Sequence, residues 1–319
     1  MRAFRIESTA SKPALRDIAR PTPGPGEISL KIKACGLNFA DLLMANGTYQ
    51  DTPDVPFTLG MEVSGIVDGL GENVDSPEPG TRVAVFAGQG GMAEYGCFPA
   101  ERAVVLPDSM DFADAAAFLI TYGTSHVALD YKAKLQCGET LLVLGAAGGV
   151  GLAAVEIGKL MGARVVACAR GARKLAVAKS AGADHLINAK TDDIRQKCKE
   201  LGGIDVVYDP VGGDQFKAAF RSCRPEARLL PIGFASGEIP NIPANHLLVK
   251  NLTVMGLYWG GYLKFRPNVV ANSVKRLFHW YGEGRLAPHV SRKLPLESAC
   301  EGLELMRNRK STGKIVVMP

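Results

Sequence analysis

The stretch LLVLGAAGGVG at residues 141–151 constrains the fold more than any other part of the chain. An apolar run typical of a buried strand passes directly into a turn that contains Gly145, Gly148, Gly149 and Gly151. A strand that ends in closely spaced glycines and opens a helix can present backbone N–H groups to a phosphate, and the helix N-terminus adds about half a positive charge there. Ala146 breaks the strict G-x-G-x-x-G spacing, so the interpretation of the motif depends on the strands and helices around it.

Those surroundings are an alternation of short apolar strands and glycine-closed helices. Helices are predicted at 150–162, 173–182 and 191–203, and strands at 140–145, 164–169, 185–188, 205–209, 228–233 and 252–257. Such an alternation predicts a parallel sheet with helices on both faces. In this context the turn predicts a dinucleotide site, with the pyrophosphate at Gly145, Ala147, Gly148, Gly149, Val150 and Gly151. The alternative is a glycine-rich packing turn without a ligand.

The segments on either side have a different sequence pattern. Residues 1 to about 120 contain strands broken by glycine and proline, predicted at 27–34, 62–69, 81–87 and 92–98. After residue 265 the pattern predicts a helix at 269–281, a strand near Lys293, a helix at 296–306 and a last strand at 314–319. This tail is too short to form a domain, so it is expected to return to the first one.

Length and composition agree with a folded two-domain protein. The chain has 319 residues, of which 47% are hydrophobic and 22% charged. The net charge of +5 is spread along the chain, which argues against a nucleic-acid-binding arm.

No apolar stretch is long enough for a membrane span and no signal peptide is recognised, so a cytoplasmic location is predicted. The seven cysteines form no C-x-x-C pair, so no disulfide framework is expected.

The charge after the second strand of the alternation predicts which dinucleotide binds. An NAD site usually carries an acidic residue there, for the ribose 2′-hydroxyl. Here no acidic residue lies between Glu156 and Asp184, and the strand runs into Arg170, Arg173 and Lys174. A 2′-phosphate can pair with such cations, so NADPH is the predicted cofactor, held mainly by Arg170 and Lys174. Alternatively these cations are a solvated first helical turn, where they would oppose the helix dipole.

Together with GAAGGVG, the stretches GLNFADLLMANGTY (36–49) and TLGMEVSGIVDGLGENV (58–74) resemble the medium-chain dehydrogenase/reductase superfamily. Within it the chain looks most like the zinc-free quinone oxidoreductase (zeta-crystallin-like) and enoyl reductase branch. The resemblance implies an α/β fold: a Rossmann doubly wound parallel sheet at 124–265 that binds NADPH, and a mainly β GroES-like catalytic domain at 1–123 and 266–319. It also implies a homodimer, formed through the sheet edge near 252–257.

The zinc ligands of the superfamily are replaced in this chain. Asn38 stands where zinc-dependent members have a cysteine, and Met61 stands between Gly60 and Glu62 where they have histidine. Methionine cannot replace a neutral imidazole as a zinc ligand, so no metal is expected. Without a Lewis acid to stabilise an alkoxide, the hydride is expected to go to an acceptor that delocalises the charge itself, such as a quinone or an α,β-unsaturated carbonyl or thioester.

The resemblance also implies roles for single residues. Asn38 could donate from its amide to a developing oxyanion, and Tyr49 could act as the acid through a hydroxyl with an ordinary pKa near 10. Otherwise Asn38 stabilises a loop and Tyr49 packs. Thr124, Asp209, Gly233, Phe234 and Lys314 match cofactor-site positions of relatives; for Lys314 an exposed strand lysine is the alternative. His126 is expected to be a packed neutral histidine, and Glu62 a structural carboxylate that needs a partner.

An NADPH-dependent quinone oxidoreductase with a small-molecule substrate is therefore the leading hypothesis. A reductase that saturates the C=C bond of an enoyl thioester or alkenal is the alternative, because Lys264 and Arg266 could meet the phosphates of a coenzyme A carrier. A non-catalytic NADPH-binding protein is the hypothesis from a different class. Nucleic acid and membrane partners are not expected, since neither a basic run nor a stacking platform for single strands is present.

Overall fold

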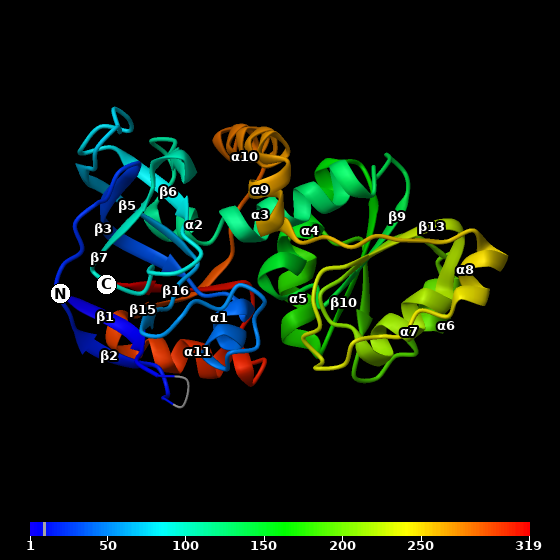
Figure 1. Ribbon diagram of the computed structural model, residues 1–319. Helices are drawn as coiled ribbons and strands as arrows, with labels where there is room; N and C mark the ends of the chain where they lie inside the picture. Colours follow the sequence, from blue (N-terminus) through cyan, green and yellow to red (C-terminus); the bar gives the residue numbers. More distant parts are fainter. Residues whose placement is uncertain (9–10) are drawn as a thin grey trace. The chain divides into compact units, whose positions relative to one another are not determined.

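The computed structural model describes residues 1–8 and 11–319, and it divides the chain into two units (Figure 1). Unit 1 contains residues 1–120 and 288–319, and unit 2 contains residues 121–287. In this division the chain returns to the first unit at residue 288, and the first boundary lies close to the predicted residue 123.

The second boundary lies later than the predicted residue 266. Helix α10 (Pro267–Gly282) belongs to unit 2, because its Ser273 hydroxyl lies 2.9 Å from Nδ1 of His126 and its Trp280 ring meets the His126 ring edge-on. The apolar stripe of an amphipathic helix fits either unit, so the sequence pattern could not decide where α10 packs.

Unit 1 is built from two sheets. A small antiparallel sheet has the order β2-β1-β4, and a larger one has the order β15-β16-β3-β5-β6-β8, with β7 also paired to β3. The strands are β1 (Arg2–Ile6), β2 (Ala14–Asp17), β3 (Glu27–Gly36), β4 (Phe57–Thr58), β5 (Glu62–Leu70), β6 (Arg82–Phe86), β7 (Tyr95–Pro99), β8 (Ala103–Val105), β15 (Val290–Pro295) and β16 (Lys314–Met318). The predicted strands of this half are confirmed.

Unit 1 also contains helices that the all-β pattern did not indicate. These are α1 (Phe39–Ala45) and α2 (Phe112–Ala116), whereas α11 (Ala299–Arg307) is the helix predicted in the returning tail. Helix α1 is only seven residues long, which is too short to show a helical period. Leu303 of α11 packs with strand residues such as Leu30, Val63 and Ile315 in one apolar core.

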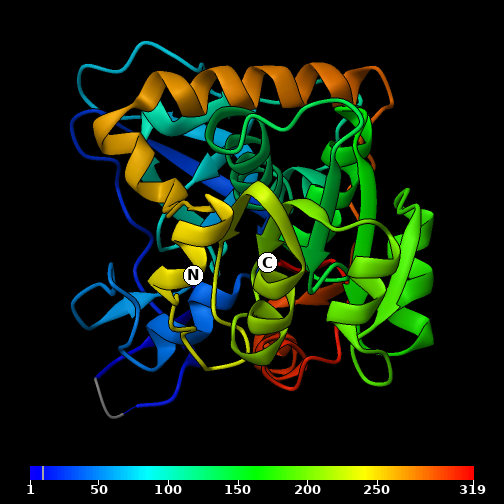
Figure 2. The ribbon, with the colours of Figure 1, turned by 90° about the vertical axis from the view of Figure 1, so that its right-hand side faces the viewer.

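Unit 2 is a parallel sheet of order β11-β10-β9-β12-β13-β14, covered by helices on both faces (Figures 1 and 2). Its strands are β9 (Thr140–Leu144), β10 (Arg164–Ala169), β11 (His185–Asn188), β12 (Ile204–Asp209), β13 (Cys223–Pro231) and β14 (Thr253–Val254). Its helices include α4 (Gly149–Leu160), α5 (Ala172–Ser180), α6 (Ile194–Glu200), α7 (Gly213–Ser222), α8 (Ala244–Lys250) and α9 (Trp259–Phe265), besides α10. The order of the strands confirms the predicted doubly wound Rossmann sheet.

Strand β9 lies at the centre of this sheet, and every one of its residues is buried. Leu142 and Leu144 pack with Phe216 of α7 on one face. On the other face Leu141 lies directly under Gly158 of α4, where a Cβ atom would come within 2.5 Å of its Cδ2. A strand covered on both faces needs apolar side chains on both faces. This explains why the four residues LLVL are all apolar, without the alternation of apolar and polar residues that a half-exposed strand shows.

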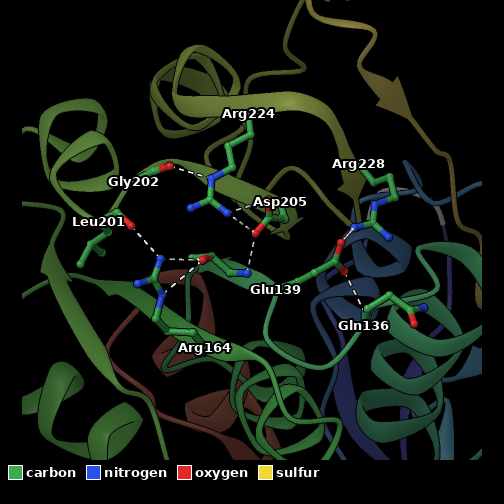
Figure 3. A network of polar contacts seen from close by, with 9 residues as sticks. Gln136, Glu139, Arg164, Leu201, Gly202, Asp205, Arg224 and Arg228 are labelled. Atoms are coloured by element: carbon green, nitrogen blue, oxygen red, sulfur yellow. Dashed lines mark hydrogen bonds and ion pairs between the residues drawn. The ribbon is translucent and has the colours of Figure 1, made fainter.

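The amino ends of the same strands are joined by charged side chains (Figure 3). Asp205 accepts the Thr140 N–H at 2.8 Å and pairs with Arg224 at 2.9 Å. Arg164 donates to the Leu201 carbonyl at 2.6 Å, and Arg228 pairs with Glu139. These side chains satisfy one another at the amino edge of the sheet, whereas the carboxyl edge ends in glycine turns. The carboxyl edge is therefore the one built to receive a ligand.

Candidate functional site

The glycine turn connects β9 to α4 at the carboxyl edge of the sheet of unit 2. Gly145 has a φ of +58°, a conformation that favours glycine, and its carbonyl accepts the Gly148 N–H at 3.0 Å. Gly148 precedes the helix as its N-cap and has no side chain to cap it. The N–H groups of Gly149, Val150 and Gly151 are the first of the helix and have no acceptor within it. Backbone N–H groups at a helix start are what an anion site needs, and the pyrophosphate site at this turn stays a prediction.

Gly151 allows the helix to lie close to the turn. A Cβ atom on Gly151 would come within 2.4 Å of the Gly145 carbonyl oxygen and 2.9 Å of the Ala146 Cα, distances that no side chain tolerates. Gly151 is thus needed for backbone packing. Although Ala146 breaks the G-x-G-x-x-G spacing, the last glycine of that pattern still allows the contact between the helix and the turn. Ala147 is buried in the same turn.

The strand order reverses between β9 and β12, which is the position where open α/β sheets bind ligands. Asp209 ends β12, and its buried carboxylate accepts the N–H groups of Val211 at 2.7 Å and Gly212 at 2.9 Å. Burial raises the pKa of Asp209, against the effect of these hydrogen bonds. The structure therefore gives this carboxylate a role in the turn itself. Gly233 and the exposed Phe234 follow β13 at the same edge.

Two cations follow β10, as the sequence indicates. Arg170 is exposed, and among residues 11–319 and 1–8 it has no hydrogen-bond or ion-pair partner. Gly171, with a φ of +85°, is the N-cap of α5, and the half-buried Lys174 occupies the first turn of that helix, which contains no acidic residue. The Gly171 N–H is fixed by Asn188 Oδ1 at 2.9 Å. This loop therefore presents positive charge at the carboxyl end of the second strand.

Thr124 and His126 lie in helix α3 (Leu119–His126), and both are buried. Burial lowers the pKa of His126 and so favours the neutral ring. One hydrogen bond joins Nδ1 of this ring to the Ser273 hydroxyl. This agrees with a packed neutral histidine.

Arg266, one of the two residues considered for a coenzyme A carrier, donates to the Tyr131 hydroxyl at 2.7 Å.

In unit 1 the ends of three strands bring Asn38, Glu62 and Lys314 together. In the strand pairings Gly36 lies opposite Val316 of β16 and opposite Glu62 of β5. Lys314 Nζ donates to Asn38 Oδ1 at 2.8 Å and forms an ion pair with Glu62, and Asn38 Nδ2 donates to the same carboxylate at 3.1 Å. Lys314 is only 6% exposed and Glu62 only 1%. Glu62 thus has the partner that its burial required.

Asp41 is a second buried carboxylate beside this cluster, and the sequence reasoning missed it. It accepts the Asn38 N–H at 2.7 Å and the Gly60 N–H at 3.1 Å, and it is fully buried. Burial raises its pKa to about 7, against the effect of these hydrogen bonds and of the Lys314 charge. An Asn followed three residues later by Asp is a helix-start signature, which could have indicated both α1 and this role for Asp41.

Tyr49 follows α1 in the chain. It is half-buried, its carbonyl accepts the Thr52 hydroxyl at 2.6 Å, and its ring packs against the apolar core of unit 1. The role of Tyr49 as an acid stays a prediction.

Among residues 1–8 and 11–319, no three His, Cys, Asp or Glu side chains are grouped as a metal site requires. No helix in those residues is both long enough and apolar enough to cross a membrane.

A parallel sheet with a glycine turn at its reversal point, attached to an antiparallel β unit, defines the architecture of nucleotide-dependent dehydrogenases and reductases. Residues 24–108 match the family described as alcohol dehydrogenase GroES-like domain, and residues 149–276 match the family described as zinc-binding dehydrogenase. The chain belongs to the medium-chain dehydrogenase/reductase superfamily, in its quinone oxidoreductase branch, which confirms the resemblance.

Three relatives illustrate the match. Quinone oxidoreductase-like protein 2 homolog of Nematostella vectensis is 40% identical over 92% of this chain and 82% of its own. Synaptic vesicle membrane protein VAT-1 homolog of Homo sapiens is 33% identical over 95% of this chain and 82% of its own. The crystal structure of Escherichia coli quinone oxidoreductase complexed with NADPH covers 100% of this chain and 99% of its own, with a TM-score of 0.91 and 27% identity.

Proposed function

We propose that this protein is an NADPH-dependent reductase of quinones. The observation that carries the proposal is the carboxyl edge of the sheet in unit 2, where a glycine turn that opens a helix is followed by Arg170 and Lys174, with no acidic residue in the first turn of α5. Both features suit a phosphorylated dinucleotide. The Escherichia coli relative, a quinone oxidoreductase complexed with NADPH, supports the same assignment.

In this proposal the turn residues Gly145 to Gly151 hold the pyrophosphate through backbone N–H groups. Arg170 and Lys174 bind the 2′-phosphate, and Thr124, Gly233, Phe234 and Lys314 remain predicted cofactor contacts. When bound, NADPH supplies a hydride. Asn38 and Tyr49 remain the residues predicted for the substrate side, and a cytoplasmic location remains a prediction.

The test is NADPH consumption measured in parallel with 1,4-benzoquinone, 9,10-phenanthrenequinone, crotonyl-CoA, acryloyl-CoA and a 2-alkenal. We expect the highest kcat/KM with a quinone. A preference of more than tenfold for a thioester would replace the quinone assignment with the enoyl reductase one. No measurable turnover with any acceptor, together with tight NADPH binding, would favour the non-catalytic alternative.

The same assay tests the cofactor with the double variant Arg170→Ala, Lys174→Ala. We expect its KM for NADPH to rise at least tenfold and its KM for NADH to change little, because only NADPH carries the 2′-phosphate that these cations would pair with. Lys190→Ala, an exposed lysine after β11, is the matched control and should change neither value. Equal effects of the double variant on both cofactors would remove the phosphate role from Arg170 and Lys174.

We also propose that two copies associate through unit 2. β14 is the outermost strand of the sheet, and the preceding helix α8, which packs against β13, has Leu248 78% and Val249 76% exposed (α8 faces the viewer in Figure 2). An edge strand beside exposed apolar side chains is a surface that proteins usually cover. A second copy of this chain would cover both.

A further inference from the structure

The small sheet of unit 1 packs one face against the apolar core and lines a cavity with the other. Phe4 of β1 belongs to the core, so the next residue, Arg5, points to the opposite face. A cavity of about 840 Å³ that opens to solvent lies on that side, and its volume falls within the range of about 300–1,000 Å³ that small-molecule sites occupy. All of the described residues that line it belong to unit 1, and none of them is Asn38, Glu62 or Lys314.

The strand register places three polar side chains on this cavity face. Arg5 lies opposite Thr58 of β4, and Arg16 of β2 lies opposite Ala3, which is two residues before Arg5 in β1. Residues that lie directly opposite each other in an antiparallel pair share a face of the sheet, as do residues two apart in one strand. Arg5, Arg16 and Thr58 therefore point to the same side, and each of them lines the cavity.

Two of these side chains carry buried polar groups whose hydrogen bonds are not made. Arg5 Nε is buried, and among residues 1–8 and 11–319 it has no hydrogen-bond acceptor; the Glu7 carboxylate, 3.3 Å away, makes an ion pair with it but no hydrogen bond. Thr58 is only 9% exposed, and within the same residues its hydroxyl has no hydrogen bond. Because buried polar groups in proteins are almost always hydrogen-bonded, an unused N–H and an unused hydroxyl on a cavity wall indicate a polar ligand there.

The charges on this face favour a ligand with a single negative charge. Arg5 and Arg16 are diagonal neighbours on adjacent strands, and Glu7 is the carboxylate beside them. Asp17 also lines the cavity, but it lies opposite Arg2 in the register and thus on the other face of the sheet. Two guanidinium groups against one carboxylate leave one positive charge, which a monoanion neutralises.

The remaining lining is mainly apolar. It includes Ile18, Pro21 and Tyr95 and the buried side chains of Ala93 and Phe98. The Cys97 thiol is also part of it, and because burial raises the pKa of Cys97 to about 11, this group stays neutral and adds no charge. The cavity therefore combines a positive charge with apolar walls.

We propose that this cavity binds a carboxylate with an apolar body, held by Arg5, Arg16 and Thr58. A guanidinium presents two parallel N–H groups to the two oxygens of a carboxylate, and the Thr58 hydroxyl adds a third donor. The bound carboxylate takes the place of Glu7 beside Arg5, because the Glu7 side chain is 44% exposed and an ion pair of this kind contributes little. This site goes beyond the proposed function, since it lies within unit 1 and requires neither NADPH nor a quinone.

The test is isothermal titration calorimetry with octanoate, a carboxylate with an apolar chain. Octanamide has the same chain without the charge, and acetate has the charge without the chain. We expect one octanoate per protein chain, with a dissociation constant at least tenfold lower than that of octanamide or acetate. Saturating NADPH should leave this constant within twofold, because no residue of unit 2 lines the cavity.

Substitutions in the cavity should change octanoate binding in opposite directions. Arg5→Gln should weaken it about tenfold or more, as for a lost hydrogen bond to a charged group, and the isosteric Thr58→Val should weaken it severalfold. Glu7→Gln should tighten it, because the competing carboxylate is removed. Arg292→Gln, at an exposed arginine of β15, is the matched control and should bind octanoate as the wild type does.

The tightening in Glu7→Gln cannot result from partial unfolding, which only weakens binding. Unchanged or weaker binding in this variant would therefore contradict the competition at Arg5. Wild-type affinity in Arg5→Gln, or equal affinities for octanoate and octanamide, would overturn the carboxylate site. Loss of octanoate binding when NADPH is added would assign the anion to the predicted cofactor turn instead, and none of these outcomes bears on the reduction of quinones.

Discussion

At the scale of single residues, burial decides what the ionisable groups of this protein can do. Glu156, in the middle of α4, accepts the Tyr122 hydroxyl at 2.6 Å and a backbone hydrogen bond from Ala287. These contacts do not offset its burial, which raises its pKa to about 7. Lys314 differs, because a carboxylate lies directly against it. Two buried ionisable groups of one chain are thus held in different ways, Glu156 by hydrogen bonds and Lys314 by an ion pair as well.

Glu156 should therefore make the protein less stable as the pH rises. Its folded pKa of about 7 lies above the ordinary 4.5, so the native state binds more protons than the unfolded state between these values, and the free energy of unfolding falls across that window. Glu156→Gln, whose amide oxygen can still accept the Tyr122 hydroxyl, should be on the order of 2 kcal/mol more stable than wild type at pH 8 and about equal at pH 5.

Urea unfolding of both proteins at pH 5, 6, 7 and 8 measures this difference. The exposed Glu301→Gln in α11 is the control and should follow the wild-type curve. A constant difference between Glu156→Gln and wild type at all four pH values would show that Glu156 does not titrate in this window.

At the scale of elements, the packing of α4 on the sheet determines where its N-terminus lies. Gly151 and Gly158, two turns apart, are the points of close approach to the turn and to β9. Two glycines on one helix cost conformational entropy, about 0.5–1 kcal/mol each relative to alanine. They remain useful because a closer helix brings its free N–H groups to the carboxyl edge of the sheet, where the anion is expected.

Gly151→Ala should push α4 away from the turn. The added Cβ would lie 2.4 Å from the Gly145 carbonyl oxygen, so the backbone must shift, at a cost of about 1–3 kcal/mol in the free energy of unfolding. We expect NADPH binding, measured by titration calorimetry, to weaken more than tenfold. Gly282→Ala, where a Cβ meets nothing within 4 Å, is the control and should preserve both stability and binding. Unchanged NADPH affinity in Gly151→Ala would contradict the pyrophosphate site at this turn.

At the scale of the whole molecule, the open edge of the sheet in unit 2 leads to the expectation of a dimer. Light scattering after size-exclusion chromatography should give twice the chain mass of 33.9 kDa. Replacing both Leu248 and Val249 of α8 by Asp should give the single-chain mass, because carboxylates would have to be buried without partners. Val105→Asp, at an exposed apolar position on β8 of unit 1, should leave the dimer intact. A wild-type monomer at micromolar concentration would refute the proposal.

The sequence alone determined the features that depend on local order. The apolar run at 141–144, the glycines after it and the cations at 170–174 are consecutive in the chain, so their spacing predicts a strand, a turn and the charge beside it. Helix and strand patterns likewise predicted the strands of unit 2, its helices α4, α5, α6 and α10, and the elements of the returning tail, but not α7, α8 and α9. Short elements such as α1, with no full period, were not predicted.

Only the tertiary structure decided which distant residues meet. Lys314 and Asn38 are 276 positions apart, and they touch because β16 and β3 pair in one particular register. Spacing along the chain carries no information on that register, so an exposed strand lysine and a cleft lysine were equally open alternatives. The same holds for the packing of α10 on His126. Local sequence determined most of the elements and the predicted cofactor, whereas strand pairing created the buried charge cluster of Asn38, Glu62 and Lys314.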